Sequence, residues 1–212
     1  LLVDHCENVA HIASDFAKSF GMSQVTEIGG LLHDVGKDTQ QFQDHLCGMV
    51  TPPNYHTHQG ALVAKKIGES YSEIPGYVID AIVGSIFGHH GGLISRSDWE
   101  TKLSETKSID IPPFDDVFDK TIHEMMRNLP NIDAELEQHP ATLFLLFVWV
   151  RMIYSCIVDA DYIDTEQAMD SERARLRNHH DTVSFADMQK ALSDYIDNLS
   201  KNSNASQDTL MA

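Results

Sequence analysis

Hydrophobic residues recur along this chain three and four positions apart, and no stretch alternates apolar and polar residues as a half-buried strand does. Five segments follow the helical spacing, at residues 1–21, 25–37, 54–68, 74–92 and 141–161. Gly21 and Gly36 are predicted to end two of them, because glycine commonly follows the last turn of a helix. A shorter helix is predicted after Thr39, whose side chain suits the N-cap position. The pattern therefore predicts an all-α fold, a single helical bundle domain.

The longest apolar run, ATLFLLFVWV at 141–150, is stopped by Arg151. It is too short to span a bilayer, so we expect a buried helix and no membrane partner. Residues 93–139 are polar and interrupted by prolines, and no element is predicted there. The last residues are poor in apolar side chains, which predicts a domain over 1–195 and a tail or linker over 196–212.

The charge balance restricts the possible ligands. The chain has 212 residues, of which 32 are acidic and 15 basic, giving a formal net charge of −17. Such a surface opposes non-specific binding to nucleic acid, so metal ions or a partner would have to supply positive charge to a nucleic-acid substrate. Three widely spaced cysteines without zinc-ribbon spacing, and the lack of a signal-peptide pattern, predict a reducing, cytoplasmic location.

Twelve histidines are the unusual feature of the composition, and their helical phase separates them. His5 and His56 share faces with apolar residues, whereas His11 lines up with charged residues and His58 lies on a mixed face. Spacing alone leaves His58 open as an alternative to His56. Five histidines are expected on apolar faces or at their ends: His5, His33, His56, His89 and His90.

Asp34 directly follows one of these histidines, and a lone buried polar group costs roughly 2–7 kcal/mol when it has no partner. Six such groups on four helices are most simply satisfied together by a metal centre. Imidazoles combined with a carboxylate suit first-row transition ions. A further carboxylate is expected from Asp159, Asp161 or Asp164 near the end of the last long helix, and spacing leaves Asp159 and Asp161 both open.

The motifs around these residues stand in an order that resembles a known family. LLVDHCENVA resembles its opening helix L-x-x-H-x-x-x-VA, and LLHDVGKDTQQFQDHL resembles its HD-x-GK…FQ segment. HTHQGA, GHHGGL and DADYIDTE look like its H-[ST]-x-x-GA, HH and AD-x-[aliphatic]-x-[ST]-[ED] motifs, the last of which favours Asp161. This set, over roughly residues 1–166, is similar to the HD nuclease domain of the CRISPR-associated type I nuclease-helicase, a branch of the HD superfamily.

The resemblance implies a centre of two divalent ions, with Mn, Fe, Co or Ni favoured and Mg or Zn possible. It assigns His5, His33, Asp34 and Asp161 to one ion and His56, His89 and His90 to the other, with Asp34 bridging. Two neighbouring ions activate water and stabilise charge on a phosphate. Lys37 is expected either to reach the scissile phosphate or simply to sit as a cation at a helix C-terminus.

The activity that the resemblance implies is metal-dependent cleavage of single-stranded DNA during CRISPR interference, in a prokaryotic cytoplasm. The implied partners are a helicase domain or subunit, which this chain does not contain, and the CRISPR DNA-surveillance (Cascade) complex. Two alternatives stay open. One is an HD phosphohydrolase acting on nucleotides or cyclic nucleotides, although the GGL after the histidine pair disfavours the cyclic-dinucleotide branch. The other is a non-catalytic docking domain, for which the −17 charge could complement a basic partner.

Overall fold

The computed structural model describes residues 1–49, 56–106, 116–129, 142–177 and 184–202. All regular structure in these ranges is helical and they contain no strand, so the predicted all-α class is confirmed. The α-helices are α1 (Leu2–Ala17), α2 (Ser23–Leu32), α3 (Gln40–Leu46), α4 (His56–Gly68), α5 (Gly76–Gly88), α6 (Arg96–Glu105), α7 (Asp116–Arg127), α9 (Thr142–Met169), α10 (Ser171–Arg177) and α11 (Phe185–Asn202). Two 3-10 helices, η1 (Lys18–Phe20) and η2 (Val35–Asp38), follow α1 and α2.

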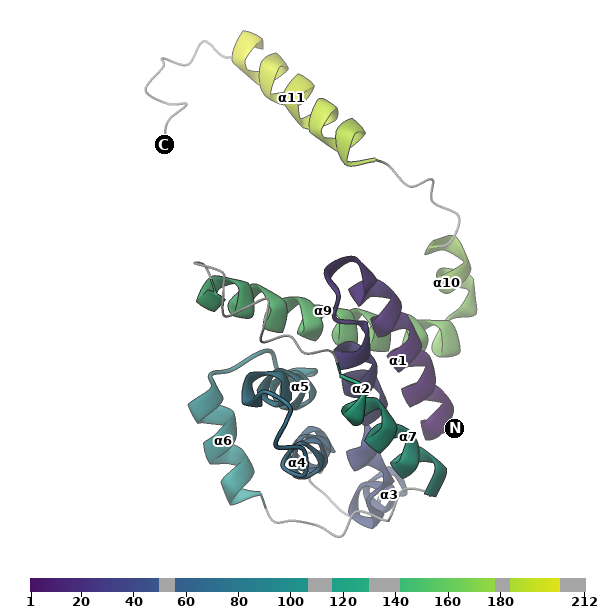
Figure 1. Ribbon diagram of the computed structural model, residues 1–212. Helices are drawn as coiled ribbons and strands as arrows, with labels where there is room; N and C mark the ends of the chain where they lie inside the picture. The colour runs from purple at the N-terminus through teal and green to yellow at the C-terminus, as the bar shows by residue number, and fades with distance from the viewer. Residues whose placement is uncertain (50–55, 107–115, 130–141, 178–183, 203–212) are drawn as a thin grey trace. The chain divides into compact units, whose positions relative to one another are not determined.

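Five helices surround the main core. α1 packs against α2 and α9, α4 packs against α5, and α5 also contacts α2 and α9 (Figure 1). Val9, Leu32, Ile86 and Ile157 are fully buried where these helices meet. Each such side chain contributes roughly 1.5–3 kcal/mol by leaving water. The apolar faces expected from the helical spacing therefore build this core.

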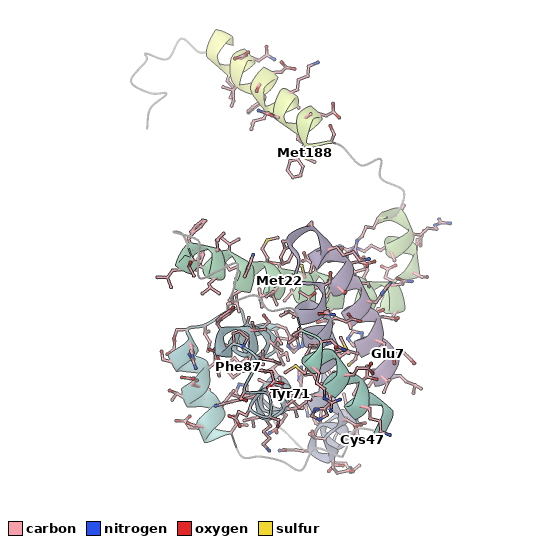
Figure 2. The ribbon with its side chains drawn as sticks, viewed as in Figure 1. Glu7, Met22, Cys47, Tyr71, Phe87 and Met188 are labelled. Atoms are coloured by element: carbon pink, nitrogen blue, oxygen red, sulfur yellow. The ribbon has the colours of Figure 1, made fainter. Side chains whose placement is uncertain are left out.

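The side chains follow the expected division between interior and surface. Met22 and Phe87 lie inside the bundle, whereas Glu7 is on the outer side of α1 (Figure 2). The predicted N-cap is present, because the Thr39 side chain accepts a hydrogen bond from the backbone N–H of Phe42. Gly21 has a φ of 76° after η1, as expected for a glycine that ends a helical segment.

Residues 93–139, for which the sequence predicted no element, contribute two helices to the described structure. Trp99 and Leu103 of α6 and Ile122 and Met126 of α7 are buried in the core. The spacing of these few apolar residues within a polar stretch was too sparse to reveal the helices. α6 and α7 therefore pack onto the bundle through these apolar side chains.

The prediction of a buried helix over 141–150 is wrong for one of its faces. Leu143 and Phe144 of α9 are 84% and 65% exposed. α9 also continues to Met169, beyond the predicted end at Asp161, because no glycine or proline interrupts it. Within the described residues, α9 is the one helix long and apolar enough, by length and composition alone, to cross a membrane. Its packing against α1, α2 and α5 fits the core helix of a folded domain.

The chain divides into two compact units, Leu1–Asp170 and Ser171–Ala212. All residues of the expected metal centre belong to the first unit. The predicted boundary after residue 195 falls inside α11 of the second unit and stays a prediction. Most of the predicted tail, residues 203–212, lies outside the described residues, as do His139, His179 and His180.

Candidate metal centre

The expected site residues come from the ends of helices that meet in the core. His33 and Asp34 directly follow α2, and His56 is the first residue of α4. His89 directly follows α5. His5 extends from the first turns of α1 and Asp161 from the second half of α9. Because these helices pack against one another in the core, residues up to 156 positions apart in the chain become neighbours.

The structure brings all seven predicted metal ligands into two adjacent groups. Asp34, His56, His89 and His90 form one group, and His5, His33 and Asp161 form the other. In each group the nitrogen and oxygen atoms lie within 4.8 Å of one another. The division between the groups follows the one implied by the resemblance, and the binding of ions by these residues stays a prediction.

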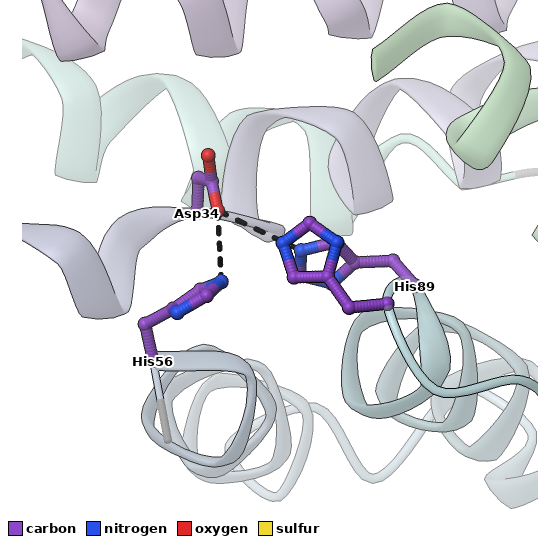
Figure 3. A group of neighbouring side chains, drawn as sticks. Asp34, His56 and His89 are labelled. Carbon is purple, nitrogen blue, oxygen red and sulfur yellow. Dashed lines mark ion pairs between the residues drawn. The ribbon is translucent and has the colours of Figure 1, made fainter. Parts of the chain in front are cut away.

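Asp34 lies between the two groups, with one carboxylate oxygen toward each. Its Oδ1 is 3.5 Å from Nε2 of His56 and 3.6 Å from Nε2 of His89 (Figure 3). Its Oδ2 is 3.5 Å from Nε2 of both His5 and His33. The carboxylate is 1% exposed. This position is that of a carboxylate able to bridge two ions.

The atoms at the centre lack hydrogen-bond partners. Both oxygens of Asp34 and the Nε2 atoms of His33, His56 and His89 are buried without one. Unsatisfied buried polar atoms are rare in folded proteins, and each costs about 1–3 kcal/mol. Divalent ions bound by these atoms would remove that penalty, so the donors present fit a metal centre.

The opposite nitrogens of two imidazoles are held by backbone carbonyls. Nδ1 of His33 lies 2.7 Å from the carbonyl oxygen of Gly30, and Nδ1 of His89 lies 2.7 Å from that of Ile86. A carbonyl oxygen only accepts, so each Nδ1 carries the proton and Nε2 keeps its lone pair. Metal-binding histidines commonly have this arrangement.

Nearby charges and burial shift the pKa values of the ionisable groups in opposite directions. Burial lowers the pKa of His33 to about 4 and that of His56 to about 4, so both rings are neutral at pH 7. The nearby carboxylates of Asp161 and Asp34 raise the pKa of His5 to about 10, because they stabilise the protonated ring. Burial raises the pKa of Asp34, but the nearby His5 and His89 rings outweigh this effect and hold the pKa below its usual range. A proton must therefore leave His5 when a metal ion binds.

Lys37 joins the cluster through an ion pair between its Nζ and Oδ2 of Asp34. Its side chain is 29% exposed, so the ammonium group lies at the opening of the site. Of the two expectations for Lys37, this contact places it beside the centre. It also supplies positive charge to the buried carboxylate.

Gly36 does not end a helix, contrary to the prediction. α2 already ends at Leu32, and Gly36 lies within η2 without a positive φ. A Cβ atom at Gly36 would overlap the backbone carbonyl of His56. Gly36 therefore allows η2 to approach the start of α4, and this close approach places Asp34 beside His56. The sequence showed the glycine but gave no sign of this approach.

The remaining candidates lie outside the two groups. The His58 ring stacks on Phe87 with centroids 4.5 Å apart, and its Nδ1 lies 3.2 Å from Oγ1 of Thr106. Asp159 is exposed, whereas Asp161 is buried among the histidines. The alternatives that spacing left open are thus separated by position. Asp164, which the sequence named without a role, contacts His5.

Comparisons with known proteins find a family model and a relative that matches part of this chain. A family model described as HD domain matches residues 2–129, which include every predicted site residue except Asp161. The chain is 35% identical over 91 residues to a protein named ribonuclease Y from Pseudothermotoga lettingae. That stretch covers 42% of this chain and 14% of ribonuclease Y, so the likeness is confined to a small part of the relative.

Proposed function

The chain belongs to the HD domain family, and we propose that it is a nuclease that hydrolyses phosphodiester bonds of single-stranded DNA. Membership of this family implies a metal-dependent phosphohydrolase. The observation that carries this proposal is the position of Asp34. Its two oxygens face two separate groups of imidazoles, and the Nε2 atoms of His33, His56 and His89 are buried without hydrogen-bond partners. A centre for two ions suits the hydrolysis of a phosphodiester, in which the attacking and leaving oxygens both need stabilisation.

The residues divide the work as follows. His5, His33 and Asp161 would hold one ion, His56, His89 and His90 would hold the other, and Asp34 would be shared between them. Bound ions supply a Lewis acid for the phosphate oxygens and lower the pKa of a water molecule. Lys37 exchanges its contact with Asp34 for one with the scissile phosphate, so that its charge stabilises the developing negative charge. The exposed His90 marks the side from which substrate enters.

The preference for DNA rests on the ordered set of motifs, which is similar to that of the CRISPR-associated nuclease. The charge of −17 means that the chain itself offers little attraction to a polyanion. A helicase domain or subunit, and the CRISPR DNA-surveillance complex, are therefore proposed as partners that supply the strand. The same proposal places the protein in a prokaryotic cytoplasm.

RNA is the second candidate substrate, since the relative from Pseudothermotoga lettingae is named a ribonuclease. Free nucleotides are a third, because the family membership alone also fits a small-molecule phosphohydrolase. These candidates share the proposed metal chemistry and differ only in what reaches the centre.

Parallel cleavage assays distinguish these substrates. The full chain, stripped of metal and reloaded with Mn²⁺, Co²⁺, Ni²⁺, Fe²⁺, Zn²⁺ or Mg²⁺, is incubated with circular single-stranded DNA, single-stranded RNA, nucleoside triphosphates or cyclic nucleotides. Nicked DNA circles, with Asp34→Ala inactive and Asp159→Ala active, are the expected result. Cleavage of RNA alone, or turnover of nucleotides alone, would contradict the DNA assignment. No hydrolysis of any of them by the metal-loaded chain would contradict an enzymatic role and favour a docking domain.

A further inference from the structure

Two carboxylates of α9 contact opposite edges of the same imidazole ring. Oδ1 of Asp161 lies 3.3 Å from Nε2 of His5, on the side of the metal centre. Oδ2 of Asp164 lies 2.6 Å from Nδ1 of His5, on the far side. Because these acids are three residues apart, they project from the same face of α9. Asp161 belongs to a ligand group, but Asp164 does not.

The contact with Asp164 determines which nitrogen of His5 can bind a metal ion. A carboxylate oxygen accepts hydrogen bonds, so Nδ1 of His5 donates its proton to Asp164. The lone pair of the neutral ring is then left on Nε2, which points at Asp34 and Asp161. Without a partner for Nδ1, either nitrogen could carry the proton and the ring could turn over.

The Nδ1 atoms of His33 and His89 are also fixed by an acceptor, but in these two residues the acceptor is a backbone carbonyl. Nδ1 of His33 and Nδ1 of His89 each donate to a backbone carbonyl three residues earlier in the chain. His5 lies in the first turns of α1, and its side chain is 19% exposed, compared with 0% for His33. Its Nδ1 contact is made instead by a side chain 159 residues away. A ligand at the edge of the site thus depends on a distant carboxylate.

Asp164 is itself held in place from α1. Its Oδ1 accepts a hydrogen bond of 2.9 Å from Nδ2 of Asn8, three residues after His5 on the same helix. Its side chain is 13% exposed, so water competes little for these contacts. His5 and Asn8 of α1 therefore both hold the Asp164 carboxylate, with Nδ1 of His5 at one oxygen and Nδ2 of Asn8 at the other.

We propose that Asp164 is a positioning residue of the metal centre, which fixes the orientation and the tautomer of His5 so that Nε2 of His5 binds the ion shared with His33 and Asp161. This inference rests on the proposed two-ion centre and deepens it. Loss of an outer partner of a metal-binding histidine lowers metal affinity by about 10–100-fold. The loss should concern the ion held by His5, while the ion held by His56, His89 and His90 stays bound.

Metal titration of the full chain tests this role. Mn²⁺ is titrated into stripped wild-type protein and into Asp164→Ala, Asp164→Asn and Asp159→Ala variants, and the unfolding temperature of each is recorded. Asp159 is the matched control because it is an exposed acid on the same helix. We expect Asp164→Ala to weaken one of the two ions by about 10–100-fold. Asp164→Asn, which retains an acceptor oxygen, should weaken it less, and Asp159→Ala should bind as the wild type does.

Three outcomes would overturn the assignment or its premise, and they are distinct. Unchanged affinities in Asp164→Ala would contradict the positioning role while leaving the proposed function intact. Equal weakening of both ions, together with a lower unfolding temperature in metal-free protein, would show that Asp164 only supports the fold. A wild-type chain that binds no Mn²⁺ or other transition ion would contradict the proposed function itself.

Discussion

Nε2 of His56 lies 3.5 Å from Oδ1 of Asp34, although 22 positions separate the two residues in the chain. Neither atom has a hydrogen-bond partner, and both are buried. The imidazole comes from the first residue of α4 and the carboxylate from the segment between α2 and η2 (Figure 3). Such a pair is costly without a ligand and stable with one.

Replacement of His56 by alanine is predicted to abolish most of the hydrolytic activity, whereas His58→Ala should retain it. His56 contributes Nε2 to the group around Asp34, while His58 stacks on Phe87. Even the loss of an outer partner lowers activity or affinity by about 10–100-fold, so loss of a ligand should exceed about 100-fold. Rates of the two variants at saturating Mn²⁺ provide the measurement. A larger loss in His58→Ala would mean that the two histidines are assigned the wrong way round.

Gly36→Ala is predicted to weaken both folding and metal binding. The new methyl group would overlap the backbone carbonyl of His56, which cannot move without displacing the start of α4. Overpacking of this kind costs about 1–3 kcal/mol. Gly76→Ala is the matched control, since nothing lies within 4 Å of a Cβ atom there. Urea unfolding and Mn²⁺ titration of both variants measure the effect. Equal stability of the two variants would refute the close approach at Gly36.

Lys37→Ala is predicted to lower the cleavage rate by about 100-fold without weakening metal binding. The ammonium group occupies Oδ2 of Asp34 in the metal-free chain, so its removal frees that oxygen for an ion. Lys37→Arg should recover part of the rate, and Lys18→Ala, which removes an exposed cation, should have no effect. Rates and Mn²⁺ affinities are compared in parallel. A full rate in Lys37→Ala would restrict Lys37 to balancing the charge of Asp34.

The metal-free chain is predicted to lose stability as the pH falls from about 6.5 to about 4. The pKa values of His33 and His56 are lowered to about 4 in the folded protein, so the unfolded chain binds protons first on acidification. Burial of His33 alone corresponds to about 3 kcal/mol over this interval. His5 has the opposite effect on the free energy of unfolding, because its pKa is raised to about 10 in the folded protein. The stability that protonated His5 contributes is lost as the pH rises toward about 10.

Thermal unfolding in the presence of a chelator, at several pH values, measures this dependence. His56→Gln should flatten the decline between pH 6.5 and 4, because one of the histidines with a lowered pKa is gone. His11→Gln, which changes an exposed histidine, should leave the curve unchanged. An unfolding temperature that is constant over this interval would show that the imidazoles are not buried in the metal-free protein.

Much of the fold could be predicted from the sequence because helical periodicity is a local property. The faces of His5 and His56 followed directly from apolar residues four, seven and eleven positions away. The choice of Asp161 over Asp159 did not, since the two lie two residues apart on one helix and only packing buries Asp161. Sequence motifs supplied that choice.

Other features depend on contacts between distant segments and have no local signal. The approach of Gly36 to the backbone of His56 requires knowledge of how η2 meets α4. The contact of Asp164 with His5 joins residues 159 positions apart. The exposed face at Leu143 also escaped prediction, because an apolar run indicates burial only when neighbouring helices cover it on every side. Periodicity identifies a face but not its partner.

The number of ions bound per chain tests the central claim most directly. The purified 212-residue chain is stripped with a chelator, reloaded with Mn²⁺ or Co²⁺, freed of excess metal and measured by elemental analysis beside Asp34→Ala. The position of Asp34 between two ligand groups predicts two ions per wild-type chain and fewer than one in Asp34→Ala. One ion or none in the wild type, or two ions in a folded Asp34→Ala variant, would contradict a centre bridged by this carboxylate.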